Sequence, residues 1–306
     1  MAGKKLVITV PASSANLGPG FDSIGLAVNR YLTLEAEQAE EWSFESESPE
    51  LATMPAGNDN LVYKAASGLA EELGVELPPC HVKMTTEIPL ARGLGSSAAA
   101  IVAAIELVNG LTRTELSIEE KLRYASLWEG HPDNVGPCLY GGLIVGTHSK
   151  VETNLVHCGV PDVDLVLAVP SSELLTEEAR GILPESLNYA DAIRGSSIGN
   201  VLVAALLKEE WDLVGRMMGS DIFHHPYREK LVPGLTDIIN NARRYGAYGA
   251  ALSGAGPTIV CLAPAGEGSA VCGELQKDYP DFHIYPARPA PFGATVRYVE
   301  DKSFSS

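Results

Sequence analysis

Pro89-Leu-Ala-Arg-Gly-Leu-Gly-Ser-Ser-Ala-Ala-Ala100 is the stretch of sequence that decides the fold. An expected strand over His81–Ile88 leads into it, and an apolar, alanine-rich run continues from it to about Asn109 and Gly110. The change of pattern predicts a strand, a glycine-serine turn and a helix in direct succession.

The turn carries four residues that suit the binding of an anion. Gly93 and Gly95 permit positive φ angles and close backbone approach, so successive N–H groups can converge on one point. Ser96 and Ser97 then open the helix, whose first-turn N–H groups have no partners within it. Unpaired donors, the positive end of the helix dipole and two hydroxyls suit a polyphosphate and its Mg²⁺. An ordinary capped helix after a tight turn fits the same glycines equally well.

Two better-known nucleotide-binding motifs do not account for the turn. The Walker A pattern occurs nowhere in the chain. Gly93-x-Gly95-x-x-Ala98 fits the loose dinucleotide-binding fingerprint, which requires a second strand ending in an acidic residue about twenty positions later. Glu115 lies at that distance, but Ser117-Ile-Glu-Glu120 is a capping box that starts a helix running to about Glu129. A helix in place of the required strand disfavours NAD.

The composition indicates a protein that does not bind nucleic acid. The chain of 306 residues is long enough for one large domain or two ordinary ones. Its formal net charge of −17 opposes binding to a phosphate backbone, which relies on clustered lysine and arginine. An anionic substrate must therefore be held by local donors rather than by the overall charge.

Neither a disulfide framework nor a membrane segment is expected. The five cysteines are odd in number and widely spaced and include no C-x-x-C pair, so we expect reduced thiols in a cytosolic protein. No apolar run is expected to reach the length of a membrane span. The first ten residues are typical of a strand rather than of a signal peptide.

Strands and helices alternate irregularly along the chain, which predicts an α+β fold. A composition break at about 150–162 predicts a boundary between two domains, residues 1–158 and 159–306. The first half is expected to contain strands at 4–10 and 24–37, an acidic, exposed region at about 40–55, a helix at 60–73 that stops at Gly74, a short apolar stretch after residue 134 and a strand near 142–147. The second half is expected to contain strands at 164–170, 249–252, 258–263, 282–287 and 294–299, and helices at about 188–208, 211–218, 233–244 and 268–278.

Two further glycine-rich segments share the character of the first. Pro11-Ala-Ser-Ser-Ala-Asn-Leu-Gly-Pro-Gly-Phe-Asp22 is expected as a long loop between the first two strands, where about two residues would make a hairpin. A loop of this length that carries Asn16 and Asp22 favours a functional role. Ser253-Gly-Ala-Gly-Pro257 joins two later strands and fits either a site or plain architecture.

Taken in order, the three motifs closely resemble those of the GHMP kinase superfamily of small-molecule kinases. The resemblance covers nearly the whole chain and includes its length and the spacing between motifs. It implies a two-domain GHMP kinase fold, with an N-terminal ribosomal-protein-like α+β domain and a C-terminal ferredoxin-like α+β domain. Within the superfamily, Pro11–Asp22 and Glu129-Gly-His-Pro-Asp-Asn134 are similar to the homoserine kinase family. The implied activity is ATP-dependent phosphorylation of the side-chain hydroxyl of L-homoserine to O-phospho-L-homoserine, on the cytoplasmic route to threonine.

The resemblance assigns ATP to the glycine-serine turn. Backbone N–H groups across Gly93–Ala98 would hold the β- and γ-phosphates. Mg²⁺ prefers hard oxygen ligands, and the resemblance assigns it to Ser97 and Glu129. The adenine pocket is expected near residues 58–63. The expected ATP-binding residues are Pro89, Leu90, Ala91, Arg92, Gly93, Leu94, Gly95, Ser96, Ser97, Ala98 and Ala99.

An amino-acid substrate needs cations for its carboxylate and acceptors for its ammonium group. The resemblance assigns the carboxylate to Arg180 and Arg228, because a planar guanidinium binds a carboxylate at two points. From the sequence alone, each arginine also fits an ordinary surface position, and residues 131–134 also fit a structural histidine and a plain turn. The residues assigned to the ammonium and hydroxyl ends are Asn16, Asp22, His131 and Asn134.

No strong general base is expected. Some related kinases use an aspartate–lysine pair to activate the hydroxyl, but the motifs here contain no lysine, and Asn134 stands where that aspartate is found. A loose transition state needs little prior deprotonation of the attacking hydroxyl. The expected mechanism is alignment and charge stabilisation by Asn134, Asp22, Glu129 and Ser97, with Asp22 orienting the substrate.

Other functions fit parts of the pattern. Another GHMP kinase would act on an isoprenoid alcohol, a sugar or shikimate, and a regulatory protein on the same fold would have lost its phosphate loop. The net charge opposes the third alternative, a nucleic-acid-binding module. A metal site at His224-His225 is disfavoured, because adjacent side chains point apart and no further ligand is expected near them. Small molecules are the expected partners, with neither nucleic acid nor membrane, and a homodimer is allowed.

Overall fold

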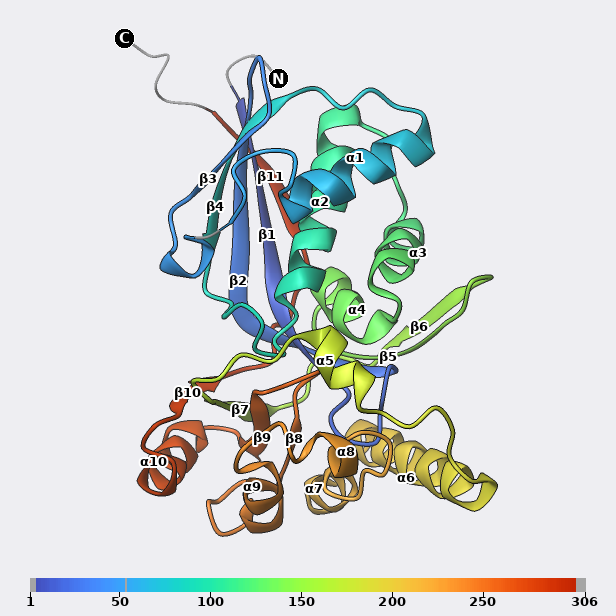
Figure 1. The fold of residues 1–306 in the computed structure, drawn as a ribbon, viewed down its shortest axis with the longest axis vertical. Helices are drawn as coiled ribbons and strands as arrows, with labels where there is room; N and C mark the ends of the chain where they lie inside the picture. The colour runs from blue at the N-terminus through green and yellow to red at the C-terminus, as the bar shows by residue number, and fades with distance from the viewer. Residues whose placement is uncertain (1–3, 53, 301–306) are drawn as a thin grey trace.

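The computed structural model describes residues 4–52 and 54–300 and divides their strands between two sheets (Figure 1). The strands are β1 (Lys4–Ala15), β2 (Ile24–Gln38), β3 (Ser43–Ser46), β4 (Cys80–Thr86), β5 (Leu143–His148), β6 (Thr153–His157), β7 (Val163–Val169), β8 (Gly249–Leu252), β9 (Ile259–Pro264), β10 (His283–Ala287) and β11 (Thr295–Glu300). The helices are α1 (Leu61–Leu73), α2 (Ser96–Thr112), α3 (Ile118–Glu129), α4 (Pro132–Tyr140), α5 (Thr176–Gly181), α6 (Tyr189–Leu207), α7 (Trp211–Met218), α8 (His225–Arg228), α9 (Leu235–Asn241) and α10 (Gly268–Asp278), with a short 3-10 helix, η1, at Pro49–Leu51.

The larger sheet has the order β11-β1-β2-β4-β3, and β5 and β6 continue it from the start of β2. Its neighbours are antiparallel except for β3 and β4. Strand β1 is longer than expected: residues Ala12–Ala15 pair with Gly25–Val28 after a register shift at Pro11. A bulge accommodates proline, which cannot donate to the sheet. The first motif therefore begins inside a strand, and only residues 16–23 form the loop.

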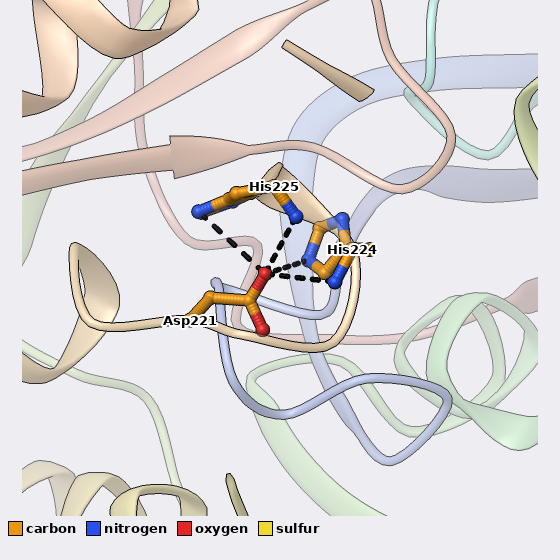
Figure 2. A group of neighbouring side chains, drawn as sticks. All are labelled: Asp221, His224 and His225. Atoms are coloured by element: carbon orange, nitrogen blue, oxygen red, sulfur yellow. Dashed lines mark hydrogen bonds and ion pairs between the residues drawn. The ribbon is translucent and has the colours of Figure 1, made fainter. Parts of the chain in front are cut away.

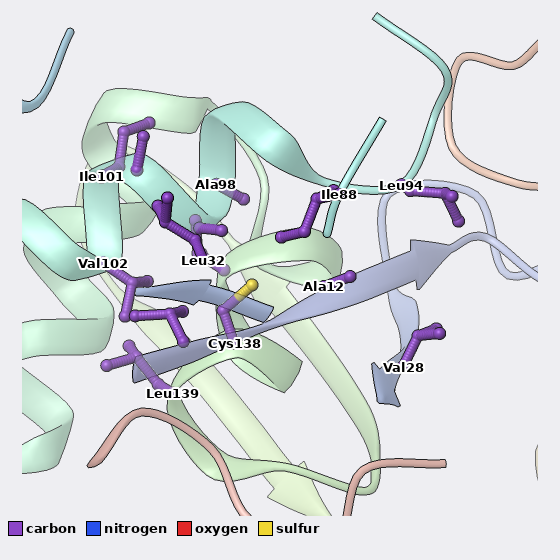
Figure 3. Close-up of a cluster of buried hydrophobic side chains, with 14 of the residues drawn as sticks. Ala12, Val28, Leu32, Ile88, Leu94, Ala98, Ile101, Val102, Cys138 and Leu139 are labelled. Carbon is purple, nitrogen blue, oxygen red and sulfur yellow. The ribbon is translucent and has the colours of Figure 1, made fainter. Parts of the chain in front are cut away.

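Helices α2 and α4 pack against one face of the larger sheet, and α1 and α3 pack beside them on the same side (Figure 1). Helix α2 is at the centre of this layer, and its residues from Ala98 to Val108 are all buried. Figure 3 shows part of the resulting core, in which the start of α2 packs on Ala12 and Leu32 of the sheet and on Cys138 of α4. The burial of α2 fixes its N-terminus, and therefore the glycine-serine turn, relative to the sheet.

Local capping explains where the first helices begin and end, as the sequence predicted. Asn60 caps α1 by accepting from the Val62 N–H, and Gly74 ends it in the left-handed conformation with φ of 65°. The predicted capping box at Ser117 and Glu120 is present at the start of α3. Gly130, with φ of 90°, ends α3 after Glu129, whose carboxylate faces the glycine-serine turn.

The smaller sheet has the order β10-β7-β9-β8 with every neighbouring pair antiparallel. With helices between β7 and β8 and α10 between β9 and β10, this is the ferredoxin-like connection. The α+β class predicted from the sequence is confirmed. The boundary between residues 158 and 159 stays a prediction; the last strand, β11, pairs with β1 in the larger sheet.

Three segments differ from the expectations. Residues 132–140 form α4 rather than a turn and a short apolar stretch, and the acidic region and the predicted break contain the short strands β3 and β6. Helix α6 is, by length and composition alone, apolar enough to cross a membrane, so the expectation that no segment reaches that length does not hold for it. Its residues Leu202, Ala205 and Leu206 are buried, and it packs against α7.

All five cysteines are free, as expected. Three of them, Cys80, Cys138 and Cys261, are buried, and burial raises the pKa of Cys138 and of Cys261 to about 12. A thiol with such a pKa stays protonated at neutral pH and is a poor nucleophile. Cys138 and Cys261 therefore contribute packing rather than catalysis.

Candidate active site

The three glycine-rich motifs meet between the two sheets. The backbone N–H of Ser13, in the first motif, donates to the carbonyl of Leu94 in the second at 3.2 Å. The hydroxyl of Ser253, in the third motif, donates to the carbonyl of Gly93 at 2.6 Å and lies 2.9 Å from the hydroxyl of Ser14. Segments that are more than 150 positions apart in the chain are thereby joined into one structure.

Glycine is required at two positions of this junction. Gly93 and Gly95 have φ angles of 76° and 69°, which confirms the expected left-handed conformation. A Cβ atom at Gly93 would lie 2.3 Å from the carbonyl oxygen of Ser253, and one at Gly95 would lie 2.0 Å from the hydroxyl of Ser13. The two glycines therefore serve both the turn and the close packing of the other two motifs.

A cavity of about 250 Å³ lies beside the junction. It is smaller than the pockets of about 300–1,000 Å³ that hold drug-sized ligands, so it suits a small substrate. The structure brings together around it every residue that the sequence assigned to substrate or metal: Asn16, Asp22, Ser97, Glu129, His131, Asn134, Arg180 and Arg228.

Two hard oxygen donors face each other at one end of this cavity. The hydroxyl of Ser97, in the first turn of α2, lies 3.5 Å from a carboxylate oxygen of Glu129, the last residue of α3. Burial raises the pKa of Glu129, and the nearby carboxylate of Asp133 raises it further. A cation between Ser97 and Glu129 would favour the charged carboxylate, and oxygen donors of this kind are those that Mg²⁺ prefers.

Arg180 is already paired with a carboxylate of the protein. Its two Nη atoms donate to the two carboxylate oxygens of Asp22 at 2.7 and 3.3 Å. Asp22 lies in the loop of the first motif with φ of 56°, and Arg180 lies in α5. The sequence assigned these residues to opposite ends of the substrate, so their direct contact is a finding of the structure.

Arg228 is almost completely buried, so the alternative of a surface position is wrong for it. Its Nε donates to the carbonyl of Ala179 at 3.0 Å, and its Nη1 donates to the carbonyl of Gly254 at 3.1 Å. Burial lowers the pKa of Arg228 to about 10, and the positive charge of Arg180 contributes to the shift. The guanidinium remains charged at neutral pH, and no acceptor among the described residues binds its Nη2, which is left for a ligand in the cavity.

The start of α4 determines the positions of His131 and Asn134. Nδ1 of His131 forms a short contact with the carboxylate of Asp133, which is buried in the first turn of the helix. Burial alone would lower the pKa of His131, but the hydrogen bond to Asp133 and its charge raise it. The side-chain oxygen of Asn134 accepts from the hydroxyl of Ser13 at 3.0 Å. These residues thus belong to a helix N-terminus rather than to a plain turn.

A second cavity, of about 380 Å³, adjoins the first at Ser96 and Ser97. Its walls are mostly apolar and include residues 59–62, part of the segment expected to hold adenine. Leu90 of the second motif also lines it. The glycine-serine turn thus lies between a polar cavity and an apolar one.

Not every residue assigned to ATP faces a cavity. The side chains of Leu94, Ala98 and Ala99 are buried in the core, and the N–H of Ala99 donates to the carbonyl of Gly95 within α2. The side chain of Arg92 donates instead to the carbonyl of Ser171 at 3.0 Å. Within the assigned stretch, Ala91, Gly93, Gly95, Ser96 and Ser97 line the polar cavity.

Sequence reasoning assigned no role in the site to two residues of the cavity, Phe21 and Asp133. The ring of Phe21 lies 5.6 Å from the guanidinium carbon of Arg180 and 5.5 Å from that of Arg228. Asp133 lines the cavity as well as orienting His131. Both residues lie inside the quoted motifs, and this position was a signal that they belong to the site. It was equally compatible with a buried aromatic side chain at Phe21 and with a structural role in a helix for Asp133.

The expectation of no further ligand beside His224 and His225 is wrong, because Asp221 lies against both rings (Figure 2). Its Oδ2 is 3.6 Å from Nε2 of His224 and 3.8 Å from Nδ1 of His225. However, Nδ1 of His224 faces Nη1 of Arg228, and Nε2 of His225 accepts from the N–H of Leu252. The two nitrogens that face Asp221 must then carry hydrogens, so neither has a lone pair for a metal.

Comparison with known proteins agrees with the motifs and the fold. The family model for the GHMP kinases N terminal domain matches residues 60–142, and that for the GHMP kinases C terminal domain matches residues 202–281. A curated homoserine kinase from Halalkalibacterium halodurans is 60% identical over 293 residues, which cover 95% of each chain. One from Shouchella clausii is 54% identical over 96% of this chain and 98% of its own.

A solved structure supports the same relationship. The crystal structure of homoserine kinase from Cytophaga hutchinsonii is 29% identical, covers 96% of this chain and 97% of its own, and superposes with a TM-score of 0.83. The match covers nearly the whole of both chains. The chain belongs to the GHMP kinase family.

Proposed function

We propose that the protein phosphorylates the side-chain hydroxyl of L-homoserine and thereby produces O-phospho-L-homoserine for threonine biosynthesis. Membership of a kinase family makes ATP the co-substrate. The observation that carries the proposal is the placement of two arginines, Arg180 and Arg228, in the polar cavity that also contains Ser97 and Glu129. The arginines suit the carboxylate of an amino acid, and the cavity is closed enough to hold a small one.

The ammonium group of the substrate has hydrogen-bond acceptors in the same cavity. The carboxylate of Asp22 and the side-chain oxygen of Asn16 can accept from the ammonium group, and His131 lies beside them. Asn16 Oδ1 also accepts from the backbone N–H of Asp22 at 3.0 Å, which holds the two acceptors together. A zwitterion with a hydroxyl at its far end therefore has a partner for each of its groups.

In this account, ATP binds across the two cavities. The apolar cavity beside residues 59–62 suits the base, and the glycine-serine turn suits the phosphates. Ser97 and Glu129 would hold Mg²⁺, which offsets charge on the phosphates when it is bound. This places the transferred phosphate at the boundary of the cavities, next to the substrate cavity.

The residues of the cavity favour alignment over general base catalysis. Asn134 accepts from Ser13 through its side-chain oxygen, so its amide nitrogen is the group free to donate to the substrate hydroxyl. An amide nitrogen orients a hydroxyl but does not take its proton. Both carboxylate oxygens of Asp22 accept from Arg180, and this fixed position fits an orienting role.

We also infer a cytoplasmic location and small molecules, L-homoserine and ATP, as partners, without nucleic acid or membrane. The net charge of −17 and the packing of α6 against α7 support this inference. A homodimer is compatible with it.

Release of ADP by the purified protein with ATP and Mg²⁺ tests the proposal, with L-homoserine, mevalonate, galactose and shikimate as acceptors. We expect L-homoserine to give the highest kcat/KM. Turnover with another alcohol and none with L-homoserine would contradict the substrate and leave the family unaffected.

A further inference from the structure

The buried segment before Arg228 has a fixed backbone. The carboxylate of Asp221 accepts from the backbone N–H groups of Phe223, His224 and His225 at 2.9, 3.0 and 2.7 Å. Both histidine rings are buried. The turn that leads into α8 is thereby held in one conformation, and His224 precedes Arg228 by one helical turn.

The ring of His224 connects the first motif to Arg228. Its Nε2 lies 3.0 Å from the carbonyl oxygen of Gly18, and its Nδ1 lies 3.2 Å from Nη1 of Arg228. A carbonyl can only accept and a guanidinium can only donate, so the ring must carry its hydrogen on Nε2 and a lone pair on Nδ1. Burial lowers the pKa of His224 to about 3, so the ring stays neutral and keeps this arrangement at neutral pH.

The same ring supports the aromatic surface beneath the two arginines. Phe21 stacks on His224 with ring centroids 5.2 Å apart. Phe21 in turn lies against the guanidinium groups of Arg180 and Arg228. His224 therefore contacts one arginine directly and reaches both through Phe21, although it does not line the cavity itself.

From these contacts we infer that His224 is a positioning residue for the substrate carboxylate, acting as an acceptor that fixes the Arg228 guanidinium while its other nitrogen binds the loop of the first motif. The inference rests on the proposed function, because it concerns the carboxylate of an amino-acid substrate. Arg228 has three hydrogen-bond partners in the protein, and His224 is the only side chain among them within the described residues. Loss of that acceptor leaves the guanidinium with two backbone partners, the carbonyls of Ala179 and Gly254, and fixes its orientation less firmly.

Two replacements of His224 separate its two hydrogen bonds. His224→Asn places an amide oxygen near the position of Nδ1 and keeps an acceptor for Arg228, whereas His224→Gln extends to the position of Nε2 and keeps only the link to Gly18. We expect His224→Gln to raise the KM for L-homoserine about tenfold or more, with the KM for ATP changed less than about twofold. His224→Asn should recover most of the loss.

A substrate without a carboxylate distinguishes positioning from a folding defect. For 3-aminopropan-1-ol, which is L-homoserine without its carboxylate, His224→Gln should leave kcat/KM within about threefold of the unaltered protein. His225→Gln is the matched control, since it replaces an equally buried ring and keeps an acceptor for the Leu252 N–H. It should lower thermal stability by a similar amount while leaving both KM values within about twofold.

The tautomer can be measured without turnover. Long-range proton–nitrogen NMR spectra of ¹⁵N-labelled protein should show His224 neutral with its hydrogen on Nε2, and His225 neutral with its hydrogen on Nδ1. A charged ring, or a hydrogen on Nδ1 of His224, would overturn the inference. So would equal losses for L-homoserine and 3-aminopropan-1-ol, or an unchanged KM for L-homoserine in His224→Gln. Lack of turnover of L-homoserine by the unaltered protein contradicts the proposed function alone, and the NMR spectrum then still decides the tautomer of His224.

Discussion

The carboxylate of Asp22 accepts hydrogen bonds from both Nη atoms of Arg180, at 2.7 and 3.3 Å, across 158 positions of sequence. Arg180 and Asp22 were expected to bind opposite charges of the same substrate. Their ion pair gives the cavity a cation and an anion in fixed proximity, the pattern that a zwitterionic amino acid requires. The guanidinium has five N–H groups, so Asp22 leaves donors available to a second carboxylate.

Replacement of either arginine should weaken the binding of L-homoserine selectively. Arg180→Leu and Arg228→Leu should each raise its KM about thirtyfold or more, because a bidentate partner of the carboxylate is lost, and should leave the KM for ATP within about threefold. Steady-state kinetics with each substrate varied in turn measures the effect. Arg180→Lys is the control, since it keeps the charge and loses the planar fork. Equal increases in both KM values would show a general defect and contradict the assignment.

Asp22→Asn separates orientation from proton transfer. The amide keeps the shape of the side chain and removes the charge that binds Arg180 and the ammonium group. We expect a higher KM for L-homoserine and a kcat whose dependence on pH keeps its shape. A pH profile altered in kcat alone would identify Asp22 as a general base.

The cation site predicts a dependence on the concentration of Mg²⁺. Ser97→Ala removes a neutral ligand, and Glu129→Gln removes a charged one, so we expect kcat to fall in both and further in Glu129→Gln. Excess Mg²⁺ should restore part of the activity of Ser97→Ala. The measurement is kcat as a function of the Mg²⁺ concentration. Identical curves for the variants and the unaltered protein would show that these residues do not bind the cation.

Gly95→Ala tests the packing of the motifs against each other. The new Cβ would lie 2.0 Å from the hydroxyl of Ser13, in a backbone conformation with φ of 69°. Gly74→Ala is the matched control, with φ of 65° and nothing within 4 Å of the new atom. We expect the control to lose about 1 kcal/mol of unfolding free energy from the left-handed backbone alone. Chemical denaturation should show a clearly larger loss for Gly95→Ala, together with a higher KM for ATP; similar losses in both variants would contradict the contact.

The two buried histidines predict the acid stability of the protein. Burial lowers the pKa of His224 to about 3 and of His225 to about 4, below the value of about 6.5 in an unfolded chain. The unfolded state then binds more protons, so their contribution to stability is present above pH 6.5 or so and is lost as the pH falls towards 4. Each ring should remove about 1.4 kcal/mol of unfolding free energy per pH unit in that window. Denaturation between about pH 7 and pH 5 measures the slope, and a double variant, His224→Gln with His225→Gln, should show a smaller one.

Much of the fold follows from local signals in the sequence. Asn60, Gly74 and the capping box at Ser117 are local features, and the helices that they bound were predicted within a residue. Helix α4 was missed because Pro132 and Gly136 are typical of turns, whereas in the structure Pro132 occupies the first helical position and the helix is buried. Burial against the rest of the fold, rather than the local sequence, therefore determines that this segment is helical.

Most of the candidate site could be named from the sequence because its residues lie in the quoted motifs, whereas Arg180 and Arg228 were assigned by the family resemblance. Contacts such as Asp22 with Arg180, or His224 with Gly18 and Arg228, join distant segments and have no local signature. The burial of Arg228 was similarly invisible, since an arginine in a polar segment is usually exposed. The sequence identified which chemical groups the site contains, and the structure showed which of these groups contact one another.

The most direct test of the central claim is the phosphorus NMR spectrum of the products formed from ATP and L-homoserine with Mg²⁺. Transfer to the side-chain hydroxyl predicts ADP and a new phosphomonoester signal coupled to the side-chain methylene hydrogens, in equal amounts. ADP with inorganic phosphate alone, or no reaction while another small alcohol is phosphorylated, would contradict it.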